Sequence, residues 1–313
     1  MTTLDSQRAQ EFAEALYQAR KNRVPIAPFT EAQPELAMED GYAIQQQLVS
    51  RLLADGEEIC GYKLGLTSAP MQELLGVDQP DFGPVFASTV HRDGAAVNVD
   101  SYIAPRVEAE IAVVLDQDLA GPHCTVADAF QATRGLVASI EIVDSRIVDW
   151  KIKIADTVAD LASNGAIALG DVVVPLENID PRLIGMVFTK NGQVVATGAG
   201  AAALGNPLAA VAWLANTLAP LGESLPAGSI IMTGALHAMV PIEAGDTFRA
   251  EFDHLANHSG GTVDATTMRN HRVGQHRHRS DVQDAAKRLP RTRCLGGHRS
   301  RQRWPGKSSQ GRP

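Results

Sequence analysis

The spacing of apolar residues predicts two helices at the beginning of the chain. Residues 5–21 and 37–54 each place apolar side chains three or four positions apart, as one face of an α-helix requires. The segment Pro25-Ile26-Ala27-Pro28 separates the two, because proline interrupts a helix and favours an extended backbone. We therefore expect an N-terminal helical region over residues 1–60.

From residue 58 onward, short apolar runs predict strands that alternate with a few helical segments. One helix is well marked: Asn206 is a suitable N-cap, Pro207 suits the first turn, and Gly222 follows an apolar interior. The pattern has neither repeats nor a regular alternation of strands and helices, which favours an α+β fold with a mixed, curved sheet over residues 61–255. The predicted strands cover residues 58–66, 106–115, 135–143, 165–169, 184–196, 229–234 and 244–252, the predicted helices 70–75 and 206–221, and a turn-rich stretch 76–84.

Two glutamates, Glu108 and Glu110, lie two positions apart in the predicted strand at 106–115. Side chains alternate across a strand, so both carboxylates point to the same side. One interpretation is a strand with a solvated polar face. The other is a site for a hard divalent cation such as Mg²⁺ or Mn²⁺. Carboxylates held together repel each other unless protons or a cation intervene, and such cations prefer oxygen ligands.

A third carboxylate, Glu141, lies inside the nearly continuous apolar run of residues 135–144. A charged side chain in such a strand is costly unless it is paired or bound to a metal. Three interpretations are open: partial exposure, a buried ion pair with Arg134 or Arg146, or ligation of a metal. Asp144, at the expected end of the strand, is the competing ligand.

Composition is typical of a globular protein with a substantial core. Of the 313 residues, 44% are hydrophobic, yet no run approaches the about 18 apolar residues that a membrane span needs. The N-terminus lacks the basic and apolar blocks of a signal peptide. Cys60, Cys124 and Cys294 are too scattered for a disulfide framework and have no zinc spacing. We therefore expect a cytoplasmic protein with no membrane partner.

Charge is divided unevenly between the body of the chain and its end. Residues 1–255 carry a net charge of −18, which argues against a nucleic-acid-binding fold, whereas residues 256–313 carry +10. This end is rich in Arg, His, Gln, Gly and Ser, and we expect it to be a disordered basic tail. An altered reading frame or a non-homologous extension is our preferred explanation. Binding of RNA or another polyanion through the tail is the alternative.

Six motifs, in order, resemble those of the 2-hydroxypenta-2,4-dienoate hydratases (2-keto-4-pentenoate hydratases) of the fumarylacetoacetate hydrolase superfamily. The resemblance covers residues 5–255. It implies the superfamily's mixed, curved β-roll with flanking helices, with the catalytic domain at 61–255. The motifs are Gly61-Tyr62-Lys63-Leu64-Gly65-Leu66-Thr67-Ser68, Gly76-Val77-Asp78-Gln79-Pro80-Asp81-Phe82-Gly83, Pro105-Arg106-Val107-Glu108-Ala109-Glu110, Ile140-Glu141-Ile142-Val143-Asp144-Ser145-Arg146-Ile147, Asp156-Thr157-Val158-Ala159-Asp160-Leu161-Ala162-Ser163 and Ile230-Ile231-Met232-Thr233-Gly234-Ala235-Leu236.

The resemblance implies that Glu108, Glu110 and Glu141 bind Mg²⁺ or Mn²⁺. It also matches Lys63 and Asp81 to polar groups that line the active site. We expect this lysine and aspartate to act as general acid and base, with stabilisation of enolate charge as the alternative role of Lys63. Without the resemblance, Lys63 would be read as a surface lysine and Asp81 as a turn residue.

Three further residues, Ser163, Thr233 and Gly234, are substrate-binding candidates by the same resemblance. Leu161 departs from the family pattern, which has Asn at that position, so the loop lacks one polar side chain. His237 follows the Thr233-Gly234 segment, and we interpret it as a structural or exposed histidine.

The implied activity is the metal-dependent hydration of 2-hydroxypenta-2,4-dienoate to 4-hydroxy-2-oxopentanoate, in the meta-cleavage degradation of aromatic compounds. A 2-oxo acid can chelate one metal ion, which polarises the ketone and stabilises an enolate. The alternative on the same fold is 4-oxalocrotonate (2-oxo-3-hexenedioate) decarboxylase. The resemblance also implies a homo-oligomer, with a downstream aldolase or decarboxylase of the pathway as a further partner.

Overall fold

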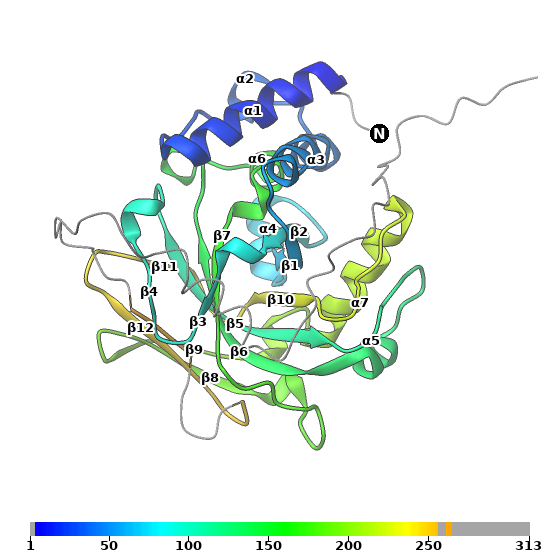
Figure 1. Ribbon diagram of the computed structural model, residues 1–313, viewed down its shortest axis with the longest axis vertical. Helices are drawn as coiled ribbons and strands as arrows, with labels where there is room; N and C mark the ends of the chain where they lie inside the picture. Colours follow the sequence, from blue (N-terminus) through cyan, green and yellow to red (C-terminus); the bar gives the residue numbers. More distant parts are fainter. Residues whose placement is uncertain (1–3, 256–260, 265–313) are drawn as a thin grey trace, which may run out of the picture.

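The structure, a computed structural model, describes residues 4–255 and 261–264 and is built around two β-sheets (Figure 1). The larger sheet has eight strands in the order β2-β1-β10-β5-β6-β7-β3, with β11 paired to β5. Its strands are β1 (Ile59–Gly65), β2 (Asp81–Phe86), β3 (Val90–Arg92), β5 (Arg106–Leu115), β6 (Thr133–Val143), β7 (Asn164–Leu169), β10 (Ile230–Ala235) and β11 (Val240–Pro241). The smaller sheet has the order β4-β13-β12-β8-β9, and its strands are β4 (Ala95–Ala96), β8 (Gly185–Lys190), β9 (Gln193–Ala199), β12 (Thr247–Phe252) and β13 (Gly261–Asp264).

The N-terminal helices form a layer at one end of the larger sheet (Figure 1). They are α1 (Ser6–Asn22), α2 (Phe29–Ala32) and α3 (Met38–Ala54), and they pack with α6 (Ile154–Ala159) around a separate apolar cluster. The side chain of Asp5 accepts a hydrogen bond from the Arg8 backbone and so caps α1. Asp40 caps α3 by accepting from the Ala37 backbone. The two helices predicted for this region are therefore confirmed.

A second group of helices lies beside β5 and β10 (Figure 1). The predicted capping of α7 (Pro207–Leu218) is confirmed, because the Asn206 side chain accepts from the Leu208 backbone at 3.0 Å and Pro207 occupies the first turn. The helix α5 (Val126–Ala132) packs against α7, and the short α4 (Ala69–Leu75) follows β1. The interior of α7 is buried, as its nearly uniform apolar sequence predicts.

The two faces of β5 have different environments, and this difference positions the site. Val107, Ala109 and Ile111 belong to the main core, together with Phe188 and Phe248 of the smaller sheet. The alternate face carries Glu108 and Glu110, followed by a smaller apolar cluster that includes Ala112, Val114, Val137, Ile167 and Met232. The glutamates therefore point away from the core between the sheets.

The α+β fold with a mixed, curved sheet is confirmed, but three local predictions were wrong. Residues 81–84, expected at the end of a turn-rich stretch, belong to β2 because β1 supplies an antiparallel partner. The single strand expected at 184–196 is a hairpin, β8 and β9, around the left-handed residues Asn191 and Gly192. Residues 261–264, expected in the disordered tail, form β13 and pair with β12 and β4. The rest of that expected tail lies outside the described residues.

Across residues 4–255 and 261–264, we find no helix with the length and apolar character needed to cross a membrane.

Candidate metal centre and active site

Strand alternation and register together bring three glutamates to one place. Glu108 and Glu110 share a face of β5, and Glu108 lies directly opposite Glu141 in the antiparallel pairing with β6. Residues opposite each other in such a pair project to the same side of the sheet. One carboxylate oxygen from each glutamate lies within 4.8 Å of the others. The structure thus gathers the three predicted metal ligands into one cluster, the carboxylate cluster.

Lys63 reaches this cluster through the order of the strands rather than through sequence proximity. It pairs with Met232 in β10, which in turn pairs with Ala112 in β5, so the row of Lys63 crosses β5 two positions after Glu110. Its Nζ lies 3.3 Å from Oε1 of Glu141 and donates a hydrogen bond to the Ala162 carbonyl at 2.9 Å. Only 4% of the residue is exposed, so the interpretation as a surface lysine is wrong.

Asp81 joins the same face from β2. It lies opposite Gly65, two positions after Lys63 on β1. A Cβ at position 65 would lie 2.2 Å from Oδ1 of Asp81, so glycine makes the space that this carboxylate occupies. Asp81 is buried in a strand, which rules out its interpretation as a turn residue. Oδ1 has no hydrogen-bond partner among the residues described.

Burial and mutual repulsion favour the protonated forms of the glutamates. Burial, reinforced by Glu141, raises the pKa of Glu108 to about 8. Burial and the two neighbouring carboxylates raise the pKa of Glu110 well above its usual value, and burial also raises the pKa of Glu141, against the opposing charge of Lys63. Burial alone would lower the pKa of Lys63, but the carboxylates, Glu141 foremost, leave it raised.

The carboxylate cluster fits a divalent cation. Among the described residues, Oε1 of Glu110 and Oε2 of Glu141 are buried without a hydrogen-bond partner, and Oε1 of Glu141 has only the ion pair with Lys63. Buried polar atoms in native proteins are almost always satisfied, so such orphaned oxygens indicate an absent partner. Three carboxylates form the all-oxygen donor set that Mg²⁺ and Mn²⁺ prefer.

The loop before β7 lies against the cluster in an uncommon backbone conformation. Leu161, Ala162 and Ser163 have φ values of 58°, 52° and 56°, three consecutive left-handed residues without a glycine. Such a run is unfavourable for residues that carry a Cβ, and it is found mainly at functional sites. It turns the Ala162 carbonyl toward Lys63. Every residue has a backbone carbonyl, so the sequence gives no sign of which one contacts Lys63, and this contact was not predicted.

Of the three substrate-binding candidates, Gly234 contacts the cluster directly, Thr233 precedes it in β10, and Ser163 follows Ala162 in the left-handed loop. Gly234 donates its backbone N–H to Oε2 of Glu110 at 2.9 Å, and Thr233 donates its hydroxyl to the Ile111 carbonyl at 2.7 Å. Ser163 is buried, with its Oγ 3.2 Å from Oγ1 of Thr157. Gly234 has a φ of 114°, and a Cβ there would lie 2.0 Å from Oγ1 of Thr67. The contacts of Gly234 and Thr233 hold β5 and Glu110, whereas binding of substrate by these residues stays a prediction.

Two charged residues near Glu141 in the sequence, Asp144 and Arg146, have other partners than those the sequence suggested. Asp144, the competing ligand, instead accepts hydrogen bonds from the backbones of Ile103 and Ala104 at 2.8–3.1 Å. Arg146, a possible partner of Glu141, is paired with the buried Asp160. Glu141 is neither partly exposed nor paired with an arginine, since its ion-pair partner is Lys63.

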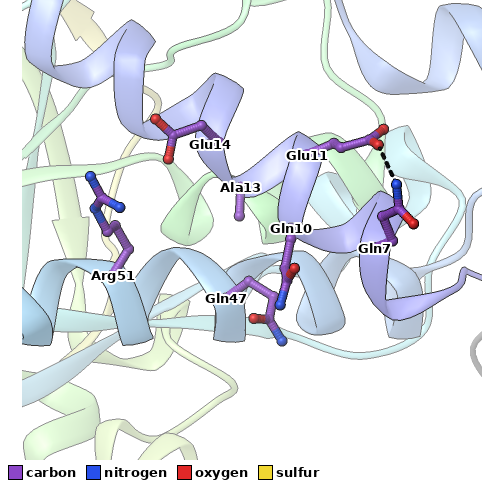
Figure 2. A pocket seen from close by; sticks show the side chains of 7 residues that line it. All are labelled: Gln7, Gln10, Glu11, Ala13, Glu14, Gln47 and Arg51. Carbon is purple, nitrogen blue, oxygen red and sulfur yellow. Dashed lines mark hydrogen bonds between the residues drawn. The ribbon is translucent and has the colours of Figure 1, made fainter.

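A polar groove elsewhere on the surface holds none of the predicted site residues. It runs between α1 and α3 (Figure 2). Gln7 and Glu11 are hydrogen bonded across one turn of α1 at its edge, and Arg51 comes from α3. Its lining residues are Gln7, Gln10, Glu11, Ala13, Glu14, Gln47 and Arg51.

Comparisons with known proteins identify the family of this chain. The family described as Fumarylacetoacetate (FAA) hydrolase C-terminal matches residues 63–268. A 2-keto-4-pentenoate hydratase from Paraburkholderia phymatum is 45% identical over 253 residues, which cover 81% of this chain and 97% of the relative. A 2-hydroxypent-2,4-dienoate hydratase from Pseudomonas putida is 46% identical over 220 residues, which cover 70% of this chain and 99% of the relative.

A solved structure is similar over nearly the same extent. The 4-oxalocrotonate decarboxylase from Pseudomonas putida G7, complexed with magnesium and adipate, superposes with a TM-score of 0.81 at 37% identity. The match covers 85% of this chain and all of that chain. The chain belongs to the hydratase and decarboxylase branch of the fumarylacetoacetate hydrolase family.

Proposed function

We propose that this protein is a hydro-lyase that adds water to 2-hydroxypenta-2,4-dienoate (2-oxopent-4-enoate) and produces 4-hydroxy-2-oxopentanoate. The observation that carries the proposal is the cluster of Glu108, Glu110 and Glu141 with buried oxygens that lack partners, beside the buried Lys63. The names of the similar hydratases support the substrate. In this role the protein acts in the meta-cleavage degradation of aromatic compounds.

In this proposal, Glu108, Glu110 and Glu141 hold a divalent cation, Mg²⁺ or Mn²⁺. When bound, the cation supplies electrostatic stabilisation to the carboxylate and ketone oxygens of a 2-oxo acid. The protein residues keep the cation in a site of which Glu110 and Glu141 are wholly buried, so that water has little access to the carboxylates. The pair of Glu108 and Glu141 fixes two of the donors on a rigid two-stranded unit.

The remaining chemistry consists of proton transfers, which we assign to Lys63 and Asp81. The substrate dienol first tautomerises to the conjugated ketone, and water then adds at C4 while a proton is delivered to C3. Lys63 Nζ is an N–H donor beside the cluster, fixed by the Ala162 carbonyl. Burial raises the pKa of Asp81, with Lys63 opposing, so this carboxyl group holds a proton more readily than an exposed aspartate and is suited to proton exchange. Ser163, Thr233 and Gly234 complete the wall beside the substrate.

The direct test is a metal-dependent hydration assay. Enzymatically generated 2-hydroxypenta-2,4-dienoate is added to metal-stripped protein, Mg²⁺ or Mn²⁺ is titrated, and 4-hydroxy-2-oxopentanoate is followed by NMR. We expect Glu110→Gln and Glu141→Gln to lose both metal binding and turnover. The control Glu177→Gln, which replaces an exposed glutamate outside the carboxylate cluster, should keep both. Turnover without added metal, or in both cluster variants, would overturn the proposal.

A decarboxylase function on the same site is the second candidate, because the 4-oxalocrotonate decarboxylase is similar over its whole length. Both reactions need an enolate next to the cation. Incubation with 2-oxo-3-hexenedioate distinguishes them, since only the decarboxylase releases CO₂. We expect water addition to the five-carbon substrate and little CO₂ from the six-carbon diacid.

A homo-oligomer and an association with a downstream aldolase or decarboxylase stay predictions. Light scattering tests the first, and co-purification tests the second.

A further inference from the structure

One backbone group next to the carboxylate cluster is satisfied by a side chain instead of a strand. The β10 strand pairs with β5 from Ile230 to Met232, and after an irregularity Ala235 pairs with Glu110. The β11 strand resumes the pairing only at Val107. Between these two points, Ala109 accepts a hydrogen bond from the Leu236 backbone at 3.0 Å. The N–H of Ala109 is left without a backbone partner in this gap.

His237 fills the gap. Its Nε2 accepts the hydrogen bond from the Ala109 N–H at 2.9 Å. Because Nε2 accepts, the ring proton is on Nδ1, which donates to the Ala238 carbonyl at 2.7 Å. The ring also stacks on Phe188, with centroids 4.5 Å apart and an angle of 29°. Three contacts thus fix the position and the orientation of this imidazole.

Ala109 is the residue between two of the three carboxylates. Its own side chain is wholly buried in the core between the sheets, while those of Glu108 and Glu110 project to the other side. The two peptide groups of Ala109 join it to Glu108 and to Glu110. Any shift or rotation of the Ala109 backbone therefore moves both carboxylates with it. The segment that follows β10 holds the Ala109 backbone at both of its hydrogen-bonding groups, the carbonyl through Leu236 and the N–H through His237.

We propose that His237 is a positioning residue of the carboxylate cluster, which sets the spacing of Glu108 and Glu110 for a divalent cation by accepting the Ala109 N–H. The inference rests on the proposed function, in which these glutamates bind the cation. Partners one step removed from a metal's ligands commonly change metal affinity by 10–100-fold when they are removed. The histidine touches neither substrate nor cation.

The test compares three substitutions that separate the acceptor from the ring. His237→Gln keeps an acceptor at similar reach, His237→Met keeps a side chain of similar length with only a weakly accepting thioether, and His237→Phe keeps the stack on Phe188 without an acceptor. His91→Phe, in β3, is the control for loss of a half-buried histidine. Mn²⁺ affinity is measured by calorimetry and by the electron paramagnetic resonance signal of free Mn²⁺, and thermal unfolding of the metal-free proteins is followed in parallel.

We expect about 10–100-fold weaker Mn²⁺ binding in His237→Met and His237→Phe, recovery to within about threefold in His237→Gln, and wild-type affinity in His91→Phe. Equal weakening in the Gln and Met variants, or wild-type affinity in both the Met and Phe variants, would overturn the inference. If one of these two fails to fold, the other still decides. Equal Mn²⁺ binding by wild type and Glu141→Gln would instead mean that the proposed function has failed.

Discussion

Glu108 and Glu141 occupy directly opposite positions of two paired strands, so the sheet holds two carboxylates side by side, with Glu141 fully buried and Glu108 half-buried. Like charges in this arrangement are destabilising, and the repulsion is greater because burial removes the solvent that would screen them. Burial first, and then Glu141, raises the pKa of Glu108 to about 8. Protons or a cation are therefore required to keep the pair together.

The first prediction concerns the pH dependence of stability in the metal-free protein. The folded state binds more protons than the unfolded state between the ordinary glutamate pKa and about 8, so the free energy of unfolding falls as pH rises through this window. Each group with such a shift contributes a slope of about 1.4 kcal/mol per pH unit. Urea unfolding of metal-stripped protein between pH 5 and pH 8 measures it.

Two comparisons check that the glutamates cause this slope. Glu108→Gln cannot titrate, so its slope should be shallower than that of the wild type by the contribution of one group. Excess Mn²⁺ binds the ionised carboxylates and should raise stability most at pH 8. A wild-type slope that is flat, or that is unchanged in Glu108→Gln, would contradict the assignment.

The second prediction concerns Gly65, whose missing side chain leaves room for Asp81. Gly65→Ala places a Cβ 2.2 Å from Oδ1 of Asp81, so the carboxylate must move. We expect turnover to fall by at least about tenfold, since displacement of a positioned proton donor by about 1 Å removes much of its contribution. Steady-state kinetics and Mn²⁺ affinity should separate, with the affinity little changed.

Gly185→Ala is the matched control, because it also replaces a strand glycine but meets no atom within 4 Å. It should leave kcat and KM unchanged. If Gly65→Ala and Gly185→Ala have the same kinetics, Asp81 either is not displaced or does not take part in turnover.

The pattern of the sequence predicts the parts of the site that depend on alternation along one strand. The strand expected at 106–115 is β5 with the same ends, and Glu108 and Glu110 share a face as spacing requires. The apolar run around Glu141 likewise gave a buried strand, β6. Local periodicity is enough here because the side-chain period of a strand is two.

The meeting of Lys63, Asp81 and Glu141 in one site could not be predicted from local sequence patterns. Lys63 meets Glu141 only because β10 lies between β1 and β5, a neighbour order that does not follow the chain. The turn-like composition around Asp81 concealed a strand that forms because β1 is available as a partner. The hairpin at Asn191 and Gly192 did have a signal, since Asn-Gly between apolar runs favours a two-residue turn, and we overlooked it.

The third prediction separates catalysis from metal binding at Lys63. In Lys63→Met the cationic donor is lost while a side chain of similar length remains. We expect turnover to fall by about 10²–10⁴-fold, as for loss of a general acid. Mn²⁺ should bind at least as tightly, because the lysine no longer competes for Glu141.

The control is Lys151→Met, which removes an exposed lysine that is paired with Asp149. It should leave turnover and metal affinity unchanged. Near-wild-type kcat in Lys63→Met, with metal bound, would exclude both proposed roles of Lys63, proton transfer and stabilisation of enolate charge.

The last prediction concerns the ion pair beneath the left-handed loop. Arg146 and Asp160 are 3% and 0% exposed, and Arg146 also donates to the backbone carbonyls of Asp160 and Asn164. Its guanidinium group therefore fixes both ends of the loop that carries Ala162 and Ser163. Arg146→Met leaves a buried carboxylate without its partner, which costs about 3–5 kcal/mol. Chemical denaturation at pH 7.5 measures the loss.

The pH dependence of that loss gives a sharper check. Burial, opposed by Arg146, raises the pKa of Asp160 to about 6 in the folded protein, and removal of the arginine should raise it further. The penalty in Arg146→Met should therefore shrink toward pH 5, where Asp160 is protonated, and Arg146→Met/Asp160→Asn should recover part of the stability at pH 7.5. Arg182→Met, which breaks the exposed pair with Asp180, should change the unfolding free energy little. A similarly small effect of Arg146→Met would show that the loop keeps its conformation without this pair.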